Sequence, residues 1–450
     1  MNIYNINYKF LMNLNSKKIL IFLFTILHVY CQNKVKEGDY SDCESSTSSN
    51  SISFSNFNIT NQEIRVNIIT KEKGIIKISD EIYFKFNKNI NISNDTLAIV
   101  LSICSKLKYE FIYIDLIISK ELLKELKKYT YGDIKVKGII DNDKSNIKER
   151  KEKIIINFSG GFDSLSLLSL LPKNSYDLVS VYWKGFEREK EFFKKFSPYT
   201  LETNFRGFLE EAKIWEFMGI GSLLYNDMIN AKYQAFGTAF EEYDFHGSYN
   251  FSIQKSFQSR PFDITGVYDI KLIQGLTEIG TALIVLKDYP LLVSESLISL
   301  ADNLSLKNYR KKLILTILKK KYNLKNAYLG FDEIIYPKNK IKWGFFVDDF
   351  LIFWWIKNIG FEETSKFFSD IPKDILEIVE SNSLEFYEKY NINYLNNIPA
   401  QYKQTVLENL GRLNIESYNE RDFLELKNVL LYMKKDHENL KNQWDKYFDF

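Results

Sequence analysis

The alternation of hydrophobic and polar residues gives the first part of the chain a mixed strand and helix pattern. Between Ile52 and Phe86, short β-branched and aromatic runs are separated by Asn, Gly, Lys and Asp, as is typical of antiparallel strands. The runs that follow predict a helix, a buried strand and an amphipathic helix, over residues 96–107, 110–118 and 120–129. Residues 51–140 are therefore expected to form an N-terminal α+β domain.

A charged, Asn-rich segment separates this domain from a second one with a different pattern. Residues 141–153 show no apolar periodicity and are expected to be a linker. From Ile154 onward, β-branched runs alternate with helical patterns, which is typical of a parallel, doubly wound sheet in an α/β fold. We therefore expect an α/β domain over residues 154–325. From Trp343 the pattern is almost entirely helical, which predicts a C-terminal helical region over residues 326–450.

The same periodicities locate individual elements of the α/β domain. Pro172 marks the end of the first helix, because proline cannot continue it. The expected strands cover residues 154–158, 177–183 and 233–237, and the expected helices cover residues 164–171, 187–196, 208–218, 223–232, 276–287, 291–300 and 307–322.

Composition narrows the classes of function. Lys and Arg number 60 against 58 Asp and Glu, so the net charge of +2 provides no overall field that would steer nucleic acid, which is a disfavoured partner. The 3 Cys and 3 His residues are scattered singly, which argues against a disulfide framework and against a Cys/His zinc site. Redox and zinc chemistry are therefore not expected.

The first fifty residues differ from the rest of the chain. Two lysines precede an apolar run from Ile19 to Cys31, and a Ser-rich stretch follows. The run resembles the core of a signal peptide, but about a dozen apolar residues are too few to span a bilayer, which takes about 20. A later start codon or an additional buried element would also explain it. We treat residues 1–50 as a leader outside the fold, with anchoring or export through residues 19–31 as the alternative.

The most informative segment is SGGFDS at Ser159–Ser164, between a β-branched run and a predicted helix. Two consecutive glycines let the backbone turn tightly and bring amide hydrogens close to a ligand, and the helix adds the positive end of its dipole. The two serine hydroxyls can donate hydrogen bonds to phosphate, and Asp163 can bind Mg²⁺. The pattern predicts a phosphate-binding loop. A plain turn in which Asp163 or Ser164 caps the helix would have a similar sequence.

A strand, SGGFDS and a helix in this order resemble the signature of N-type ATP pyrophosphatases, the PP-loop superfamily, whose fingerprint is SGGxDS. The phosphate loop of kinases, GxxxxGK[ST], does not occur in the sequence. The superfamily includes asparagine synthetase and 7-cyano-7-deazaguanine synthase, and it implies an adenine nucleotide alpha-hydrolase-like fold with ATP and Mg²⁺ as cofactors. Its members transfer AMP to a carbonyl, amide or carboxyl oxygen and release pyrophosphate. By resemblance, Asp163 and Ser159 are catalytic, and ATP is bound by Ser159, Gly160, Gly161, Phe162, Asp163 and Ser164.

Further site residues are expected where the predicted strands end, because open α/β sheets bind ligands at the carboxyl ends of their strands. Val181 and Tyr182 end the second strand and are candidates for main-chain contacts with adenine. The candidate contacts with the second substrate are Thr203, Asn204, Arg206, Thr238, Glu278, Arg310 and Lys311. Strand packing, helix capping or a solvated basic helix face would explain the same residues without a site.

Missing motifs limit which reaction fits. No cysteine follows Cys104, which disfavours persulfide thiolation, and the zinc-binding cysteines of the deazaguanine synthase branch are missing. We therefore expect an ATP-dependent adenylating C–N ligase that acts on a small-molecule acceptor, with nitrogen from free ammonia, an amine or a separate donor protein. Because the reaction uses intracellular ATP, we expect a cytoplasmic protein. The alternative is a nucleotide-binding regulatory or interaction module without turnover.

Overall fold

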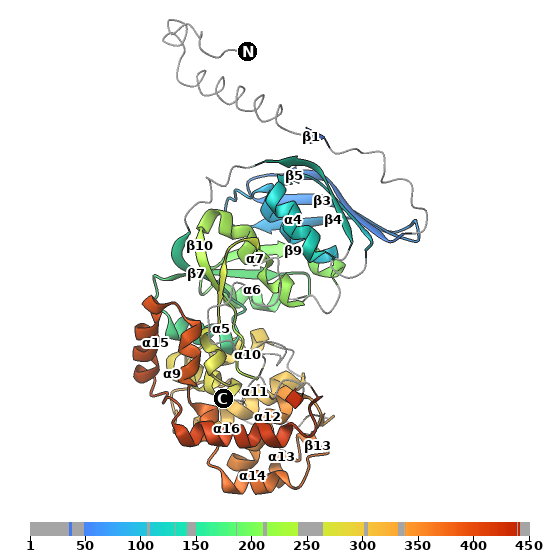
Figure 1. Cartoon of the computed structure of the whole chain (residues 1–450). Helices are drawn as coiled ribbons and strands as arrows, with labels where there is room; N and C mark the ends of the chain where they lie inside the picture. The colour runs from blue at the N-terminus through green and yellow to red at the C-terminus, as the bar shows by residue number, and fades with distance from the viewer. Residues whose placement is uncertain are drawn as a thin grey trace, which may run out of the picture. The chain divides into compact units, whose positions relative to one another are not determined.

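A computed structural model describes the chain over most of its length, in two compact units (Figure 1). The first unit is built from described residues within 1–58, 65–81 and 93–148, and the second from those within 59–64, 82–92 and 149–450. The described residues are 36–37, 49–105, 109–130, 132–141, 150–185, 187–209, 214–241, 264–300, 305–331, 337, 339–438 and 440–441. The apolar run at residues 19–31 lies outside them.

The first unit contains a mixed sheet. The strands of this sheet are β1 (Lys36–Glu37), β2 (Ser51–Ile59), β3 (Glu63–Glu72), β4 (Ile75–Phe86), β5 (Phe111–Ser119) and β6 (Asp133–Ile140), in the order β1-β6-β5-β2-β3-β4. Residue 59 of β2, residues 63–64 of β3 and residues 82–86 of β4 belong to the second unit. The helices α3 (Asn94–Ser102) and α4 (Lys120–Tyr129) each connect two strands, which allows parallel pairing of β5 with β2 and with β6. The sequence pattern predicted antiparallel strands between Ile52 and Phe86 and a buried strand at 110–118 without a direction, and it did not predict β6.

The second unit contains a parallel sheet of five strands. They are β7 (Lys151–Asn157), β8 (Tyr176–Tyr182), β9 (Tyr199–Thr203), β10 (Ala231–Ala235) and β11 (Tyr268–Ile270), in the order β9-β8-β7-β10-β11. The end of β4, which belongs to this unit, pairs antiparallel with β9. The α/β class with a mostly parallel sheet is thus confirmed. In chain order the parallel strands lie 3-2-1-4-5, so the direction of winding reverses between β7 and β10.

Helices pack on both faces of this parallel sheet. Side chains of β7 alternate, so Ile154 and Ile156 join the core that includes α5 (Phe162–Leu170), while Asn157 on the other face is hydrogen-bonded to Ser222 of α7 (Ile214–Ile229). The helix α6 (Glu187–Phe193) follows β8. Two helices were expected where α7 is one. A Cβ at Gly221 would lie 2.7 Å from the Val181 side chain. Glycine at this position therefore lets the continuous helix α7 approach β8 closely.

The C-terminal helices share one hydrophobic core with the α5 face of the sheet, from Ile154 to Leu440. They are α9 (Glu278–Asp288), α10 (Val293–Leu300), α11 (Leu306–Lys321), α12 (Phe346–Ile359), α13 (Phe361–Thr364), α14 (Ile375–Ser381), α15 (Ala400–Arg412) and α16 (Glu420–Met433), with the short pair β12 (Ile341–Lys342) and β13 (Phe368–Ser369). The helical pattern predicted after Trp343 is therefore present, and these helices are part of the second unit.

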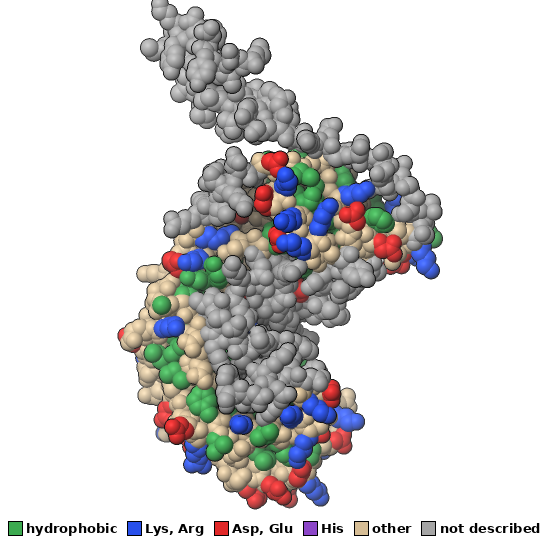
Figure 2. Space-filling view, viewed as in Figure 1, with side chains coloured by type: hydrophobic (Ala, Val, Ile, Leu, Met, Phe, Trp, Pro, Cys, Tyr) green, Lys and Arg blue, Asp and Glu red, His purple; other side chains and the backbone are tan. Residues whose placement is uncertain are grey.

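Charge is evenly distributed on the visible surface. Basic and acidic side chains are interspersed over the described part of the face shown in Figure 2. This agrees with the net charge of +2. None of the helices in the described ranges has the length and hydrophobicity that crossing a membrane requires.

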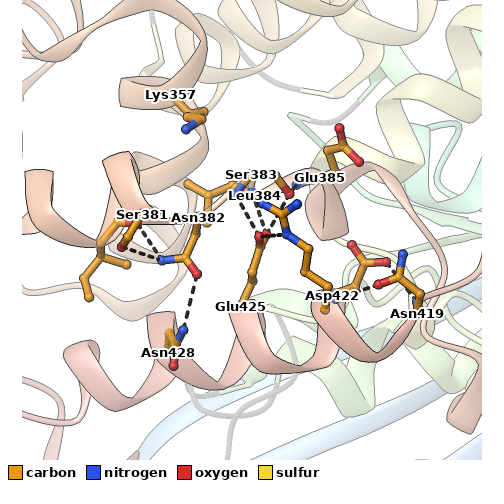
Figure 3. Close-up of polar contacts among 12 residues, drawn as sticks. Lys357, Ser381, Asn382, Ser383, Leu384, Glu385, Asn419, Asp422, Glu425 and Asn428 are labelled. Atoms are coloured by element: carbon orange, nitrogen blue, oxygen red, sulfur yellow. Dashed lines mark hydrogen bonds and ion pairs between the residues drawn. The ribbon is translucent and has the colours of Figure 1, made fainter.

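A carboxylate of α16 holds a strained turn in the C-terminal helices (Figure 3). Leu384 has a φ of 60°, a left-handed conformation that costs a branched residue free energy. The Glu425 carboxylate accepts hydrogen bonds from the amides of Ser383 (2.8 Å) and Leu384 (2.7 Å). The turn leads into the 3₁₀ helix η8 (Glu385–Glu388), and its Tyr387 carbonyl accepts the Thr277 hydroxyl (2.5 Å) at the start of α9. The turn therefore fixes the start of α9.

We expect Glu425→Ala to lower the free energy of unfolding by about 2 to 6 kcal/mol, because two amides of the strained turn lose their acceptor at about 1 to 3 kcal/mol each. Urea unfolding monitored by circular dichroism measures the change. Glu420→Ala is the matched control, since Glu420 is exposed in the first turn of the same helix and contributes at most about 1 kcal/mol. Equal effects of the two substitutions would contradict this role of Glu425.

Candidate functional site

The Ser159–Ser164 loop joins β7 to α5 at the carboxyl end of the central parallel strand. Gly160 has a φ of 75°, and a Cβ at this position would lie 2.5 Å from the Phe192 ring. The Ser296 hydroxyl donates to the Gly160 carbonyl (2.6 Å), and the Ser164 hydroxyl donates to the Gly161 carbonyl (2.9 Å). The loop is therefore held in a tight turn that only glycine accommodates at position 160.

Neither Asp163 nor Ser164 caps α5. The N-cap residue is Gly161, which has no side-chain cap, and no described residue accepts a hydrogen bond from the first-turn amides of residues 162–164. Asp163 instead accepts a hydrogen bond from the Thr281 hydroxyl of α9 (2.7 Å). The structural alternative of a capping Asp163 is thus wrong, and the positive end of α5 keeps its amide donors.

The loop that follows β10 packs against the first turn of α5. A Cβ at Gly237 would lie 2.8 Å from the amide nitrogen of Ser164 and 3.1 Å from Cβ of Asp163. The next residue, Thr238, is buried, and its hydroxyl oxygen has no hydrogen-bond partner among the described residues. The Glu241 carboxylate accepts the Glu278 amide (2.6 Å) at the start of α9. The loops after β7 and β10 and the start of α9 therefore meet.

Two buried cations of α11 lie beside this junction. The Lys311 Nζ is 2.7 Å from Oε1 of Glu278 and 3.9 Å from Oδ2 of Asp163, and it lies 5.2 Å from the centre of the Phe162 ring. Nη2 of Arg310 is 3.1 Å from Oε2 of Glu278. Burial alone would raise the pKa of Glu278, but Arg310 and Lys311 lower it to about 2. Glu278 is therefore ionised at neutral pH.

The acids that surround these cations share one position in their helices. Asp163, Glu278 and Asp348 each lie in the first turn, of α5, α9 and α12 respectively, and Arg310 also pairs with Asp348. Negative charge is favourable at the positive end of a helix. Thr277, and not Glu278, caps α9 through the amides of residues 279 and 280. The capping-box alternative for Glu278 is thus wrong, and its carboxylate is available to the cations.

Strand β8 extends past the end of β7. The Phe158 amide donates to the Val179 carbonyl, and alternate residues of a parallel strand direct their main-chain groups to the same side. Val181 is the next such residue, and β7 ends two residues earlier, opposite Val179. The main-chain amide and carbonyl of Val181 therefore face the beginning of the Ser159–Ser164 loop. The hydroxyl of the neighbouring Tyr182 donates a hydrogen bond to the Glu202 carboxylate (3.2 Å).

Three candidate residues after β9 hold the main chain in place. The Thr203 hydroxyl donates to the carbonyl of Tyr83 (2.6 Å), and the Asn204 side chain accepts the amide of the same residue (2.9 Å). Arg206 donates to the Leu209 carbonyl (3.3 Å). Thr203 and Asn204 thus connect the end of β9 to β4, and no contact between these three side chains and Asp163 is found in the described part of the chain.

Sequence reasoning missed Thr281, Ser296 and Asp348. Thr281 follows Glu278 by three residues on a predicted helix, so helical spacing could have placed it on the same face. Ser296 and Asp348 contact partners 136 and 38 residues away, and no local pattern marks such pairs.

A polar pair is buried in the sheet beside the site. Gln234 and Asp269 are opposite each other in the register of β10 and β11, so their side chains share one face. Asp269 is 1% exposed, and neither its carboxylate oxygens nor Nε2 of Gln234 has a hydrogen-bond partner among the described residues. Burial raises the pKa of Asp269 to about 7, although Lys271 opposes the shift.

The described residues contain no group of three or more His, Cys, Asp or Glu side chains that could hold a metal ion. Comparison with known proteins gives no match, since no family model, no curated protein and no solved structure is similar to this chain.

We expect Asp269 to contribute an increasing loss of stability as pH rises from about 4 to 7. The unfolded Asp269 carboxyl ionises near pH 3.8 and the folded one near pH 7, so the unfolded state binds fewer protons in this window. The penalty reaches roughly 4 kcal/mol and is constant above pH 7. Asp269→Asn should remove it, so the variant gains stability over wild type at pH 8 but not at pH 4. Thermal unfolding at both pH values tests this, and an equal difference at both would contradict it.

Proposed function

We propose that this protein is an ATP-dependent adenylating enzyme that forms AMP and pyrophosphate. The observation that carries the proposal is the position of the SGGFDS loop. It follows the first strand of a parallel sheet of order 3-2-1-4-5, beside the reversal between β7 and β10, where doubly wound nucleotide-binding sheets bind their ligands. The PP-loop resemblance of the sequence and this location support the same type of nucleotide site.

The loop and its surroundings suit the two leaving phosphates of ATP. The first-turn amides of α5 and the hydroxyls of Ser159 and Ser164 supply donors, and Lys311 supplies a buried positive charge. These groups would stabilise the charge that develops on pyrophosphate as the bond between the α-phosphorus and the bridging oxygen breaks. Phosphate binding requires Lys311 to move toward the loop, because its ammonium group lies 2.7 Å from Oε1 of Glu278.

A magnesium ion would arrive with the nucleotide. Asp163 lies in the first turn of α5, directly after the loop glycines, and the described residues offer no complete set of protein ligands for a metal. Mg²⁺ in such sites is held by one or two carboxylates together with substrate phosphates and water. Asp163 fits this role, and Thr281 orients its second oxygen (2.7 Å).

Adenine and the acceptor would bind on either side of the loop. The main-chain groups of Val181 offer one donor and one acceptor to the edge of adenine. Thr238, whose hydroxyl has no hydrogen-bond partner within the described ranges, follows β10, on the side where the acceptor would lie. An acceptor carbonyl, amide or carboxyl oxygen attacks the α-phosphorus and pyrophosphate leaves. Ammonia or an amine then attacks the activated carbon, and AMP leaves with the oxygen.

We expect Asp163→Ala to reduce AMP and pyrophosphate release at least 100-fold, because Mg²⁺ loses its carboxylate. Labelled ATP incubated with Mg²⁺ and a metabolite extract, with the products separated by chromatography, measures this. Asp133→Ala, which removes an exposed carboxylate of β6, should match wild type. Release of ADP would contradict adenylation. Tight ATP binding without any product would favour a nucleotide-binding module.

A further inference from the structure

We infer that Asp348 of α12 is a positioning residue that sets the location of the Lys311 ammonium group through Arg310 and Glu278. The inference rests on the proposed function for its effect on phosphate binding. It concerns a residue 185 positions away from Asp163, in the part of the chain for which no sequence motif was found.

The four side chains form a chain of alternating charge that ends at the loop. Arg310 uses Nη1 for Asp348 and Nη2 for Oε2 of Glu278 (3.1 Å). The other oxygen of Glu278, Oε1, is 2.7 Å from the Lys311 Nζ, which lies 3.9 Å from Asp163. The side chains of Asp348, Arg310, Glu278 and Lys311 are only 14%, 10%, 1% and 1% exposed. Solvent therefore screens these interactions weakly.

The division of the Glu278 carboxylate between two cations depends on Asp348. A guanidinium group beside a carboxylate favours a two-bond arrangement that uses both oxygens. Asp348 pairs with Nη1 of Arg310, Nη2 of Arg310 lies beside Oε2 of Glu278, and Oε1 of Glu278 stays available to Lys311. Without the Asp348 charge, Arg310 can turn both nitrogens to Glu278 and displace Lys311 from Oε1. The ammonium group would then lose the position from which it reaches the phosphates.

The same arrangement keeps charge balanced when phosphate binds. As Lys311 moves from Glu278 toward the phosphate, Glu278 needs another cation, because a buried unpaired carboxylate is costly. Arg310 supplies this cation, and Asp348 balances the charge of Arg310 in turn. The position of α12 is itself fixed, since the Phe350 ring lies 5.4 Å from that of Phe240 in the loop after β10. Asp348 thus connects the C-terminal helices to the phosphate site.

A double-mutant cycle measured without nucleotide tests directly whether Asp348 and Lys311 are coupled through the charges between them. Asp348→Asn, Lys311→Gln and the double variant are compared with wild type by urea unfolding, and the equilibrium constants are extrapolated to water. We expect coupling of about tenfold between the two positions, transmitted through Arg310 and Glu278. If the change in the unfolding equilibrium constant of the double variant equals the product of the two single changes within twofold, the inference is overturned, whether or not the protein binds ATP.

Calorimetric titration with inorganic pyrophosphate and with MgATP tests the consequence for binding. Asp348→Asn should weaken both about tenfold, Asp348→Glu should restore part of the loss, and Asp348→Asn should have no further effect in the Lys311→Gln background. Asp133→Asn, at an exposed position, should bind as wild type does. If Asp348→Asn causes the same loss of affinity in wild type and in the Lys311→Gln background, the positioning role of Asp348 is overturned. Failure of wild type to bind either ligand contradicts the proposed function, and the unfolding cycle then still decides the coupling.

Discussion

Burial of a lysine beside a glycine-rich loop is the constraint on which the rest of the site depends. The Lys311 side chain is 1% exposed, and a buried ammonium group is stable only beside compensating negative charge. Glu278 supplies that charge, and it stays ionised because two cations are next to it. Each charge thus requires the next, from Asp163 to Asp348. The first turns of α5, α9 and α12 must therefore come together around α11.

The C-terminal helices are part of this constraint. They share a core with the α5 face of the sheet, so they cannot move independently of the loop. Thr277, which caps α9 one residue before Glu278, is hydrogen-bonded to Tyr387, 110 residues later in the chain. The turn before Tyr387 depends in turn on Glu425. A substitution in α16 can therefore shift the first turn of α9 and with it the carboxylate that holds Lys311.

The features that the sequence predicted are local ones. β-Branched runs and helical periodicity identified β7, α5 and β8, and the parallel sheet followed from their alternation. The SGGFDS loop was found because its residues are consecutive. Long-range features were missed, including the parallel pairing of β5 with β2 and the pairing of Asp348 with Arg310. Two helices, over residues 208–218 and 223–232, were expected where α7 is continuous, and the role of Gly221 within it depends on Val181 of another element.

A structure of the protein crystallised with Mg²⁺ and an ATP analogue blocked between the α- and β-phosphates would show whether the loop and Lys311 bind phosphate. We expect the β- and γ-phosphates at the first-turn amides of α5, with the Lys311 Nζ within hydrogen-bond distance of a phosphate oxygen and Arg310 still paired with Glu278 and Asp348. An analogue bound away from the Ser159–Ser164 loop, or Lys311 still paired with Glu278 beside bound phosphates, would contradict this expectation.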